Sequence, residues 1–131
     1  MYQIERRHLD RFKIPGAEVS HKLPDGSSSR VKLVDITRSG IRFEINNPVI
    51  IGEIIELEII VPRKDKIFIK GHVVWTSKPD SESPAYAVVQ FLVFGSDERY
   101  NSMQSYEQLK ALSEEYLQAV EWLQSAKIKP T

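Results

Sequence analysis

The chain has 131 residues, the size of one domain, and its 18 Lys and Arg balance 18 Asp and Glu, so the formal net charge is zero. A general polyanion binder that depends on net positive charge is therefore disfavoured. The sequence contains no cysteine, which excludes disulfides, thiolate nucleophiles and cysteine-ligated metal centres. Its apolar stretches are too short for a membrane span or a signal peptide, and we expect a cytoplasmic protein.

The front of the chain carries a cluster of arginines, Arg6, Arg7 and Arg11. Residues 1–50 hold nine Lys or Arg against six Asp or Glu, so the cationic excess of this balanced chain lies there. Such a cluster predicts a local anion site, with a solvated basic tail as the open alternative. We expect residues 1–14 to form a flexible N-terminal arm.

The middle of the chain, residues 15–95, consists of short β-type segments separated by turn residues. The predicted strands span residues 17–23, 30–36, 41–45, 53–61, 67–76 and 85–94. Because the connections are too short for helical crossovers, the strands are expected to be antiparallel. Six antiparallel strands hide their edges best by closing, so the sequence predicts a mostly β fold built on a six-stranded antiparallel β-barrel.

From residue 96 the pattern becomes helical. Ser96 followed by two acids is typical of a helix N-cap, and Ser105 with Gln108 offers a second candidate start. An apolar stripe follows at three- and four-residue spacings, namely Leu109, Leu112, Tyr116, Val120 and Leu123. We therefore expect a C-terminal α-helix within residues 96–131, packed on the barrel or extending from it. Its stripe either covers an open end of the barrel or contacts a protein partner or a second copy of the chain.

The sequence offers little for catalysis. His8, His21 and His72 lie far apart in different predicted elements, so metal ligation is not indicated and surface or half-buried positions are expected. Residues 27–29 are serines at a predicted hairpin tip, with no histidine or acid beside them to form a triad. No glycine-rich phosphate loop is present. We expect a protein that is not an enzyme and that uses no cofactor or metal.

Two short segments carry complementary binding chemistry. Residues 6–11 supply guanidinium forks, which match phosphate oxygens and the O6 and N7 acceptors of guanine. Residues 35–40 supply a carboxylate and a hydroxyl that can accept from the N1 and N2 protons of guanine, and Gly40 allows a positive φ or a close backbone approach. Together they describe a guanine beside a phosphate. The alternative is a strand-ending turn whose side chains satisfy their own backbone.

In combination these segments resemble the signature of PilZ domains, which are bacterial receptors for the second messenger cyclic di-GMP. That signature is an Arg-x-x-x-Arg stretch followed by an Asp/Asn-x-Ser-x-x-Gly turn. Residues 7–11 match the first part and residues 35–40 the second, with Thr37 where serine is usual. The resemblance continues in Gly71-His72-Val73-Val74-Trp75 and through the last predicted strand.

The resemblance implies a barrel with a C-terminal helix, a ligand on the outer face of the barrel, and an arm that closes over that ligand. The residues that it implies for cyclic di-GMP binding are Arg6, Arg7, Arg11, Asp35, Thr37, Ser39, Gly40, Arg42 and Trp75. For Trp75 a core position is the alternative.

These observations leave three alternative functions. The first is a non-enzymatic receptor that changes conformation on binding cyclic di-GMP and thereby regulates a partner. The second is a PilZ-like interaction module without nucleotide that acts through the C-terminal helix. The third, a barrel that binds single-stranded DNA or RNA, is disfavoured because Glu53, Glu56 and Glu58 occupy a middle strand.

Overall fold

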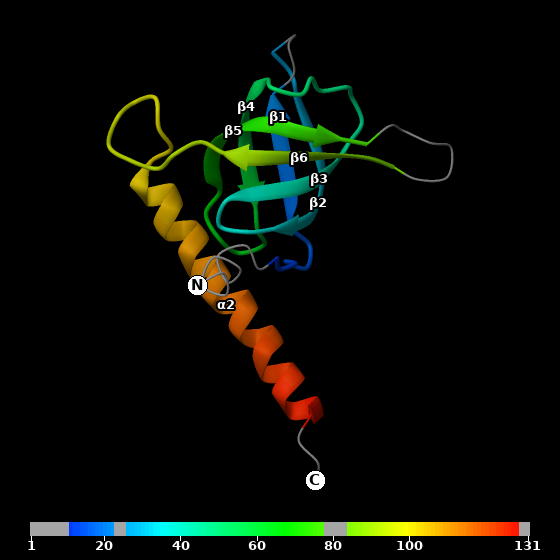
Figure 1. Cartoon of the computed structure of the whole chain (residues 1–131), viewed down its shortest axis with the longest axis vertical. Helices are drawn as coiled ribbons and strands as arrows, with labels where there is room; N and C mark the ends of the chain where they lie inside the picture. The colour runs from blue at the N-terminus through cyan, green and yellow to red at the C-terminus, as the bar shows by residue number, and fades with distance from the viewer. Residues whose placement is uncertain (1–10, 23–25, 78–83, 129–131) are drawn as a thin grey trace.

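The structure is a computed structural model that describes residues 11–22, 26–77 and 84–128, with the side chains of 118–128 outside the description. The elements are β1 (Glu18–Lys22), β2 (Ser28–Ile36), β3 (Gly40–Ile45), β4 (Ile54–Ile60), β5 (Ile67–Thr76), β6 (Ala85–Phe91) and α2 (Met103–Ile128). Figure 1 shows the strands wrapped around one another with the helix along one side. No described helix is long and apolar enough to cross a membrane.

The strands form a closed barrel in the order β1-β2-β3-β6-β5-β4, and every neighbouring pair is antiparallel. This confirms the predicted barrel. The physical basis is visible in β3, where Ile41, Phe43 and Ile45 are buried while Arg42 and Glu44 between them point outward. Alternation with period two buries one face of each strand, and closing the sheet removes the unpaired edges.

The last residues of the expected arm belong to the barrel. Phe12 and Ile14 are only 3% and 4% exposed. The backbone N–H of Phe12 donates to the carbonyl of Ile36 at 2.9 Å, and that of Ile36 donates to the carbonyl of Phe12 at 3.0 Å. A free arm over residues 1–14 is therefore wrong for residues 12–14, because two large apolar side chains gain more from burial than from chain freedom. Arg6 and Arg7 lie outside the described residues.

Helix α2 begins at Met103, which lies between the two starts predicted from the sequence, Ser96 and Ser105. Its N-cap is Ser102, whose hydroxyl accepts the backbone N–H of Ser105 at 3.1 Å. The side chain of Asp97 instead accepts the backbone N–H of Arg99 at 2.9 Å within a turn.

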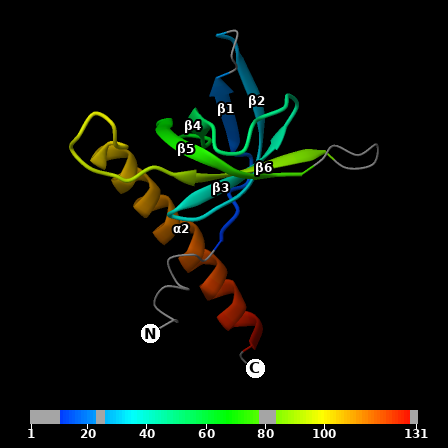
Figure 2. The ribbon, with the colours of Figure 1, turned by 45° about the horizontal axis from the view of Figure 1, so that its top comes forward.

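The stripe of α2 packs on the barrel at its first half. Leu109 and Leu112 are 2% and 3% exposed and belong to the core, and Tyr116 packs against it. The side chains of Val120 and Leu123 lie outside the described part. Figures 1 and 2 show the helix running beside the barrel and continuing past it. The first half of the stripe therefore packs against the barrel core.

His21 lies inside the barrel, where a surface or half-buried position was expected. Its side chain is 1% exposed and its ring centroid is 5.5 Å from that of Phe43. Its Nε2 has no hydrogen-bond partner among the described residues. Burial without a partner disfavours the charged imidazole and lowers the pKa of His21 below its ordinary value. The residue is neutral and acts as part of the core.

Candidate functional site

The turn that joins β2 to β3 is organised by Thr37. Its hydroxyl accepts the backbone N–H of Ser39 and that of Gly40, each at 3.0 Å. The backbone N–H of Thr37 donates to the carbonyl of Gly40 at 2.8 Å, which closes the turn. In this structure the hydroxyl therefore satisfies its own backbone, as the structural alternative for this motif predicted. Threonine supplies this bond as well as the serine that is usual at this position.

Gly40 is required because β6 comes close to it. A Cβ placed on Gly40 would be 2.7 Å from the carbonyl oxygen of Val89, which is backbone and cannot move aside. The positive φ values among the described glycines occur at Gly16, Gly26 and Gly52. Of the two reasons that the sequence left open, close backbone approach is the one that applies to Gly40.

Asp35 and Arg42 form an ion pair beside this turn. The register of β2 against β3 shifts between Leu33 and Asp35, and Asp35 then pairs with Arg42 across the two strands. Arg42 Nη2 donates to Asp35 Oδ2 at 2.5 Å, and Asp35 is 6% exposed. Arg42 Nε is buried and has no partner within the described chain. The pair holds one carboxylate oxygen of Asp35 in a sheltered position and leaves Oδ1 for another donor.

Most of the predicted ligand residues surround one depression of about 280 Å³ on the outer face of the barrel, which we call the motif hollow. It is lined by Arg11, Asp35, Thr37, Ser39, Gly40, Ile41, Arg42, Val74, Val88, Val89 and Gln90. Six of the nine expected residues therefore meet in space. Guanidinium, carboxylate and hydroxyl groups around a small depression give both donors and acceptors for a polar anionic ligand.

Trp75 lies near the motif hollow without lining it. It pairs with Val88, which pairs in turn with Arg42, so the three lie in one row across β5, β6 and β3. Its side chain is 48% exposed, so the core alternative for Trp75 is wrong. Val74, Val88 and Gln90 also line the motif hollow, although no motif in the sequence marks them. They occupy outward positions on β6, which pairs with β3, and on β5, which pairs with β6, and this strand order is not readable from the sequence.

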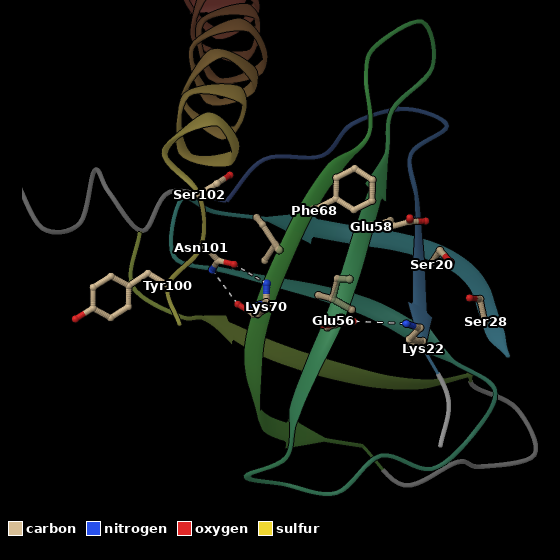
Figure 3. A pocket seen from close by; sticks show the side chains of 12 residues that line it. Ser20, Lys22, Ser28, Glu56, Glu58, Phe68, Lys70, Tyr100, Asn101 and Ser102 are labelled. Atoms are coloured by element: carbon tan, nitrogen blue, oxygen red, sulfur yellow. Dashed lines mark hydrogen bonds and ion pairs between the residues drawn. The ribbon is translucent and has the colours of Figure 1, made fainter. Parts of the chain in front are cut away.

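A second depression, of about 470 Å³, lies on the outer face of β1, β4 and β5 (Figure 3). Lys22 Nζ and Glu56 Oε2 form an ion pair of 3.9 Å across it, and Glu58 lines it as well. It contains none of the residues expected to bind cyclic di-GMP. Two lysines, Lys22 and Lys70, balance the two carboxylates, so this second depression lacks the cationic excess that Arg11 and Arg42 give the motif hollow.

Metal binding has no support in the described part of the chain, where no group of three or more His, Cys, Asp and Glu side chains could hold an ion.

Comparisons with known proteins bear on both the sequence and the fold. The family model described as PilZ domain matches residues 5–108, which include the arginine segment and the Asp35–Gly40 turn. No curated protein matches the chain.

Three solved structures share the fold. The crystal structure of YcgR in complex with c-di-GMP from Escherichia coli aligns with TM-score 0.67 and 16% identity, covering 92% of this chain and 49% of that one. The PilZ domain with c-di-GMP of YcgR from Escherichia coli gives 0.64 and 16%, covering 92% and 96%. The Bacillus subtilis inhibitor of motility (MotI/DgrA) gives 0.60 and 15%, covering 91% and 51%.

This chain thus spans about half the length of the first and third of these proteins. At such low identities the likeness concerns the fold, and the family follows from the match over most of the sequence. The chain belongs to the PilZ domain family.

Proposed function

We propose that this protein is a non-enzymatic receptor for cyclic di-GMP that changes conformation on binding and thereby regulates a protein partner. The observation that carries the proposal is the motif hollow, where Arg11, Asp35 and Arg42 meet the Thr37 turn. Family membership supports it, since PilZ domains are known as receptors for this ligand rather than as enzymes. Two of the similar structures are described as complexes with c-di-GMP.

The polar groups of the motif hollow suit a guanine next to a phosphate. Arg11, with Arg6 and Arg7 from the same segment, supplies planar forks for the O6 and N7 edge of guanine and for phosphate oxygens. Asp35 Oδ1 accepts from the N1 and N2 protons of the base, while Arg42 holds the other carboxylate oxygen. Adenine presents the wrong donor and acceptor pattern to both groups.

The remaining residues shape the surface that the ligand would meet. Thr37 fixes the turn, and Ser39 and Gly40 bring its backbone and hydroxyl to the ligand. Val74, which is 43% exposed, and Val88 give an apolar wall on which a base can lie. Trp75 in the neighbouring row offers an exposed aromatic ring for stacking.

The proposed output is a change in the surface that a partner meets, either another protein or a second copy of this chain through the C-terminal helix. A ligand shifts the protein toward one conformation by binding it more tightly than another. This mechanism requires neither catalysis nor a cofactor. We propose a cytoplasmic location, with which the absence of cysteine from the sequence is consistent.

Titration calorimetry with cyclic di-GMP, and with cyclic di-AMP as the matched ligand, tests this function. The two ligands share both phosphates and differ in the base. Each good bidentate base contact is worth about 1–3 kcal/mol, so cyclic di-AMP should bind at least about tenfold more weakly. Equal affinities would show that phosphates alone are recognised. No binding of cyclic di-GMP would favour the alternative of an interaction module that acts through its helix without nucleotide.

A further inference from the structure

The turn of the candidate site is bonded directly to helix α2. Arg38, between Thr37 and Ser39, turns its side chain toward the helix, where its Nε donates to Ser113 Oγ at 3.1 Å. Ser113 is only 1% exposed and follows the core residue Leu112. The two residues are 75 positions apart in the sequence. A hydrogen bond from a guanidinium to a buried hydroxyl is stronger and more directional than an exposed contact.

A second contact joins the arginine segment to the same part of the helix. The rings of Phe12 and Tyr116 are stacked, with centroids 6.4 Å apart and planes 8° from parallel. Phe12 follows Arg11, which lines the motif hollow, and its backbone is bonded to Ile36 at the end of β2. Tyr116 lies three residues after Ser113, on the same face of α2. The arginine segment and the β2–β3 turn therefore both contact α2 within one helical turn.

The start of the helix is anchored elsewhere. Ser105 Oγ donates to the carbonyl of Phe68 in β5 at 2.7 Å, and Gln108 Nε2 donates to the carbonyl of Lys66 at 3.4 Å. None of these residues lines the motif hollow. The helix is therefore held at its start by β5 and in its middle by the turn of the site. Packed interfaces of this kind shift between discrete arrangements rather than deforming continuously.

We infer that Arg38 and Phe12 transmit the state of the candidate ligand site to α2, which makes the helix the element that responds to the ligand. This inference rests on the proposed function. Arg38 and Phe12 do not line the motif hollow, but each is bonded in sequence to residues that do. A ligand that draws in Arg11 or rearranges Ser39 shifts the neighbouring residue by the same movement of the chain. Arg38 is thus a positioning residue that acts through Ser113.

Spin labelling can measure this response because the chain has no native cysteine. Cysteines replacing Glu56 on β4 and Glu114 on α2, both exposed, carry the two labels. Pulsed electron paramagnetic resonance then gives the distance between helix and barrel with and without saturating cyclic di-GMP. We expect the distance distribution of the labelled parent to shift when the ligand binds.

Two substitutions remove the link from opposite ends. Ser113→Ala deletes the acceptor on the helix without adding volume, and Arg38→Met deletes the donor at similar length. Each should reduce the distance shift to the part that the Phe12–Tyr116 contact transmits, and should leave the Kd measured by calorimetry within about tenfold of the parent, since coupling free energies are modest. The matched control is Lys64→Ala, which removes an exposed ion pair of 3.3 Å between the barrel and Glu115 of α2 and should keep the shift.

The outcomes separate this inference from the proposed function. A parent that binds cyclic di-GMP without any change in distance overturns the inference and leaves the receptor function standing. Full shifts in both Ser113→Ala and Arg38→Met overturn it too. Loss of binding in Arg38→Met alone, with its fold intact by circular dichroism, would make Arg38 a ligand contact and refute its positioning role. A parent that binds no cyclic di-GMP defeats the proposed function itself.

Discussion

Replacing Arg42 by methionine isolates the contribution of the ion pair beside the turn. The substitution keeps the length and the apolar stem of the side chain and removes the guanidinium that donates to Asp35 Oδ2. Asp35 is 6% exposed, so its carboxylate would remain largely out of water with no cation beside it. The variant should therefore lose stability even in the absence of any ligand.

The size of this loss follows from the burial of the two groups. Breaking a fully buried pair costs about 3–5 kcal/mol, and a hydrogen bond to a charged group is worth about 1.5–3 kcal/mol. The side chain of Arg42 is 36% exposed, so water can partly enter after its removal, and we expect about 2 kcal/mol. At roughly 2.1 cal/mol/K per residue, unfolding 131 residues carries about 0.28 kcal/mol/K, so Tm should fall by about 7 °C.

Arg30→Met is the matched control. Arg30 Nη2 lies 2.8 Å from Glu18 Oε1 on the same barrel, but the two side chains are 59% and 42% exposed. An exposed pair of this kind is worth less than about 1 kcal/mol. Urea and thermal unfolding of both variants, followed by circular dichroism, give the comparison. If Arg42→Met costs no more than Arg30→Met, the sheltered pair does not hold the turn and the reasoning is wrong.

Three further predictions test the ligand site and the core. Arg11→Lys keeps the charge and loses the planar fork, so calorimetry should show cyclic di-GMP affinity reduced about tenfold to a hundredfold; unchanged affinity would remove Arg11 from base recognition. Gly40→Ala places a Cβ 2.7 Å from Val89 O and should lower the free energy of unfolding in urea by about 1–3 kcal/mol. Ser39→Ala in the same turn should leave it nearly unchanged, and equal losses in the two variants would contradict the close approach of β6 to Gly40. Burial lowers the pKa of His21 in the folded state below its value of about 6.5 in the unfolded chain, so below that pH the unfolded state binds more protons and the free energy of unfolding should fall. The slope of unfolding free energy against pH between pH 7 and 5 should flatten in His21→Leu, and an unaltered slope would contradict the buried position of His21.

The barrel and its helix were readable from the chain itself. In β3 the alternation of Ile41, Phe43 and Ile45 with charged residues leaves only one face that can be buried, and the short connections allow only antiparallel neighbours. The arginine segment and the Asp35–Gly40 turn were also identifiable as local motifs. Such features depend on residues close together in the chain, where spacing alone decides which side chains share a face.

The helix start shows where local signals fail. Ser96 with its two acids is a good N-cap by sequence. Asn101, however, is hydrogen-bonded to the barrel, since its side chain accepts the backbone N–H of Lys70 at 2.7 Å and donates to the carbonyl of Leu92 at 3.0 Å. Those buried bonds hold the preceding segment as a loop, and the helix can begin only at Met103. A long-range contact overrides the capping signal because an unsatisfied buried amide costs more than a lost cap gains.

The alternation of apolar and polar residues, and the segments that carry guanidinium and carboxylate groups, were enough to predict the barrel and the family. Three features required the folded chain: Asp35 is held by Arg42, His21 lies inside the barrel, and Arg38 reaches Ser113 on the helix. Each of these depends on the register between strands or on the docking of α2. Both are set by the packing of the whole core, which places residues tens of positions apart within hydrogen-bond distance.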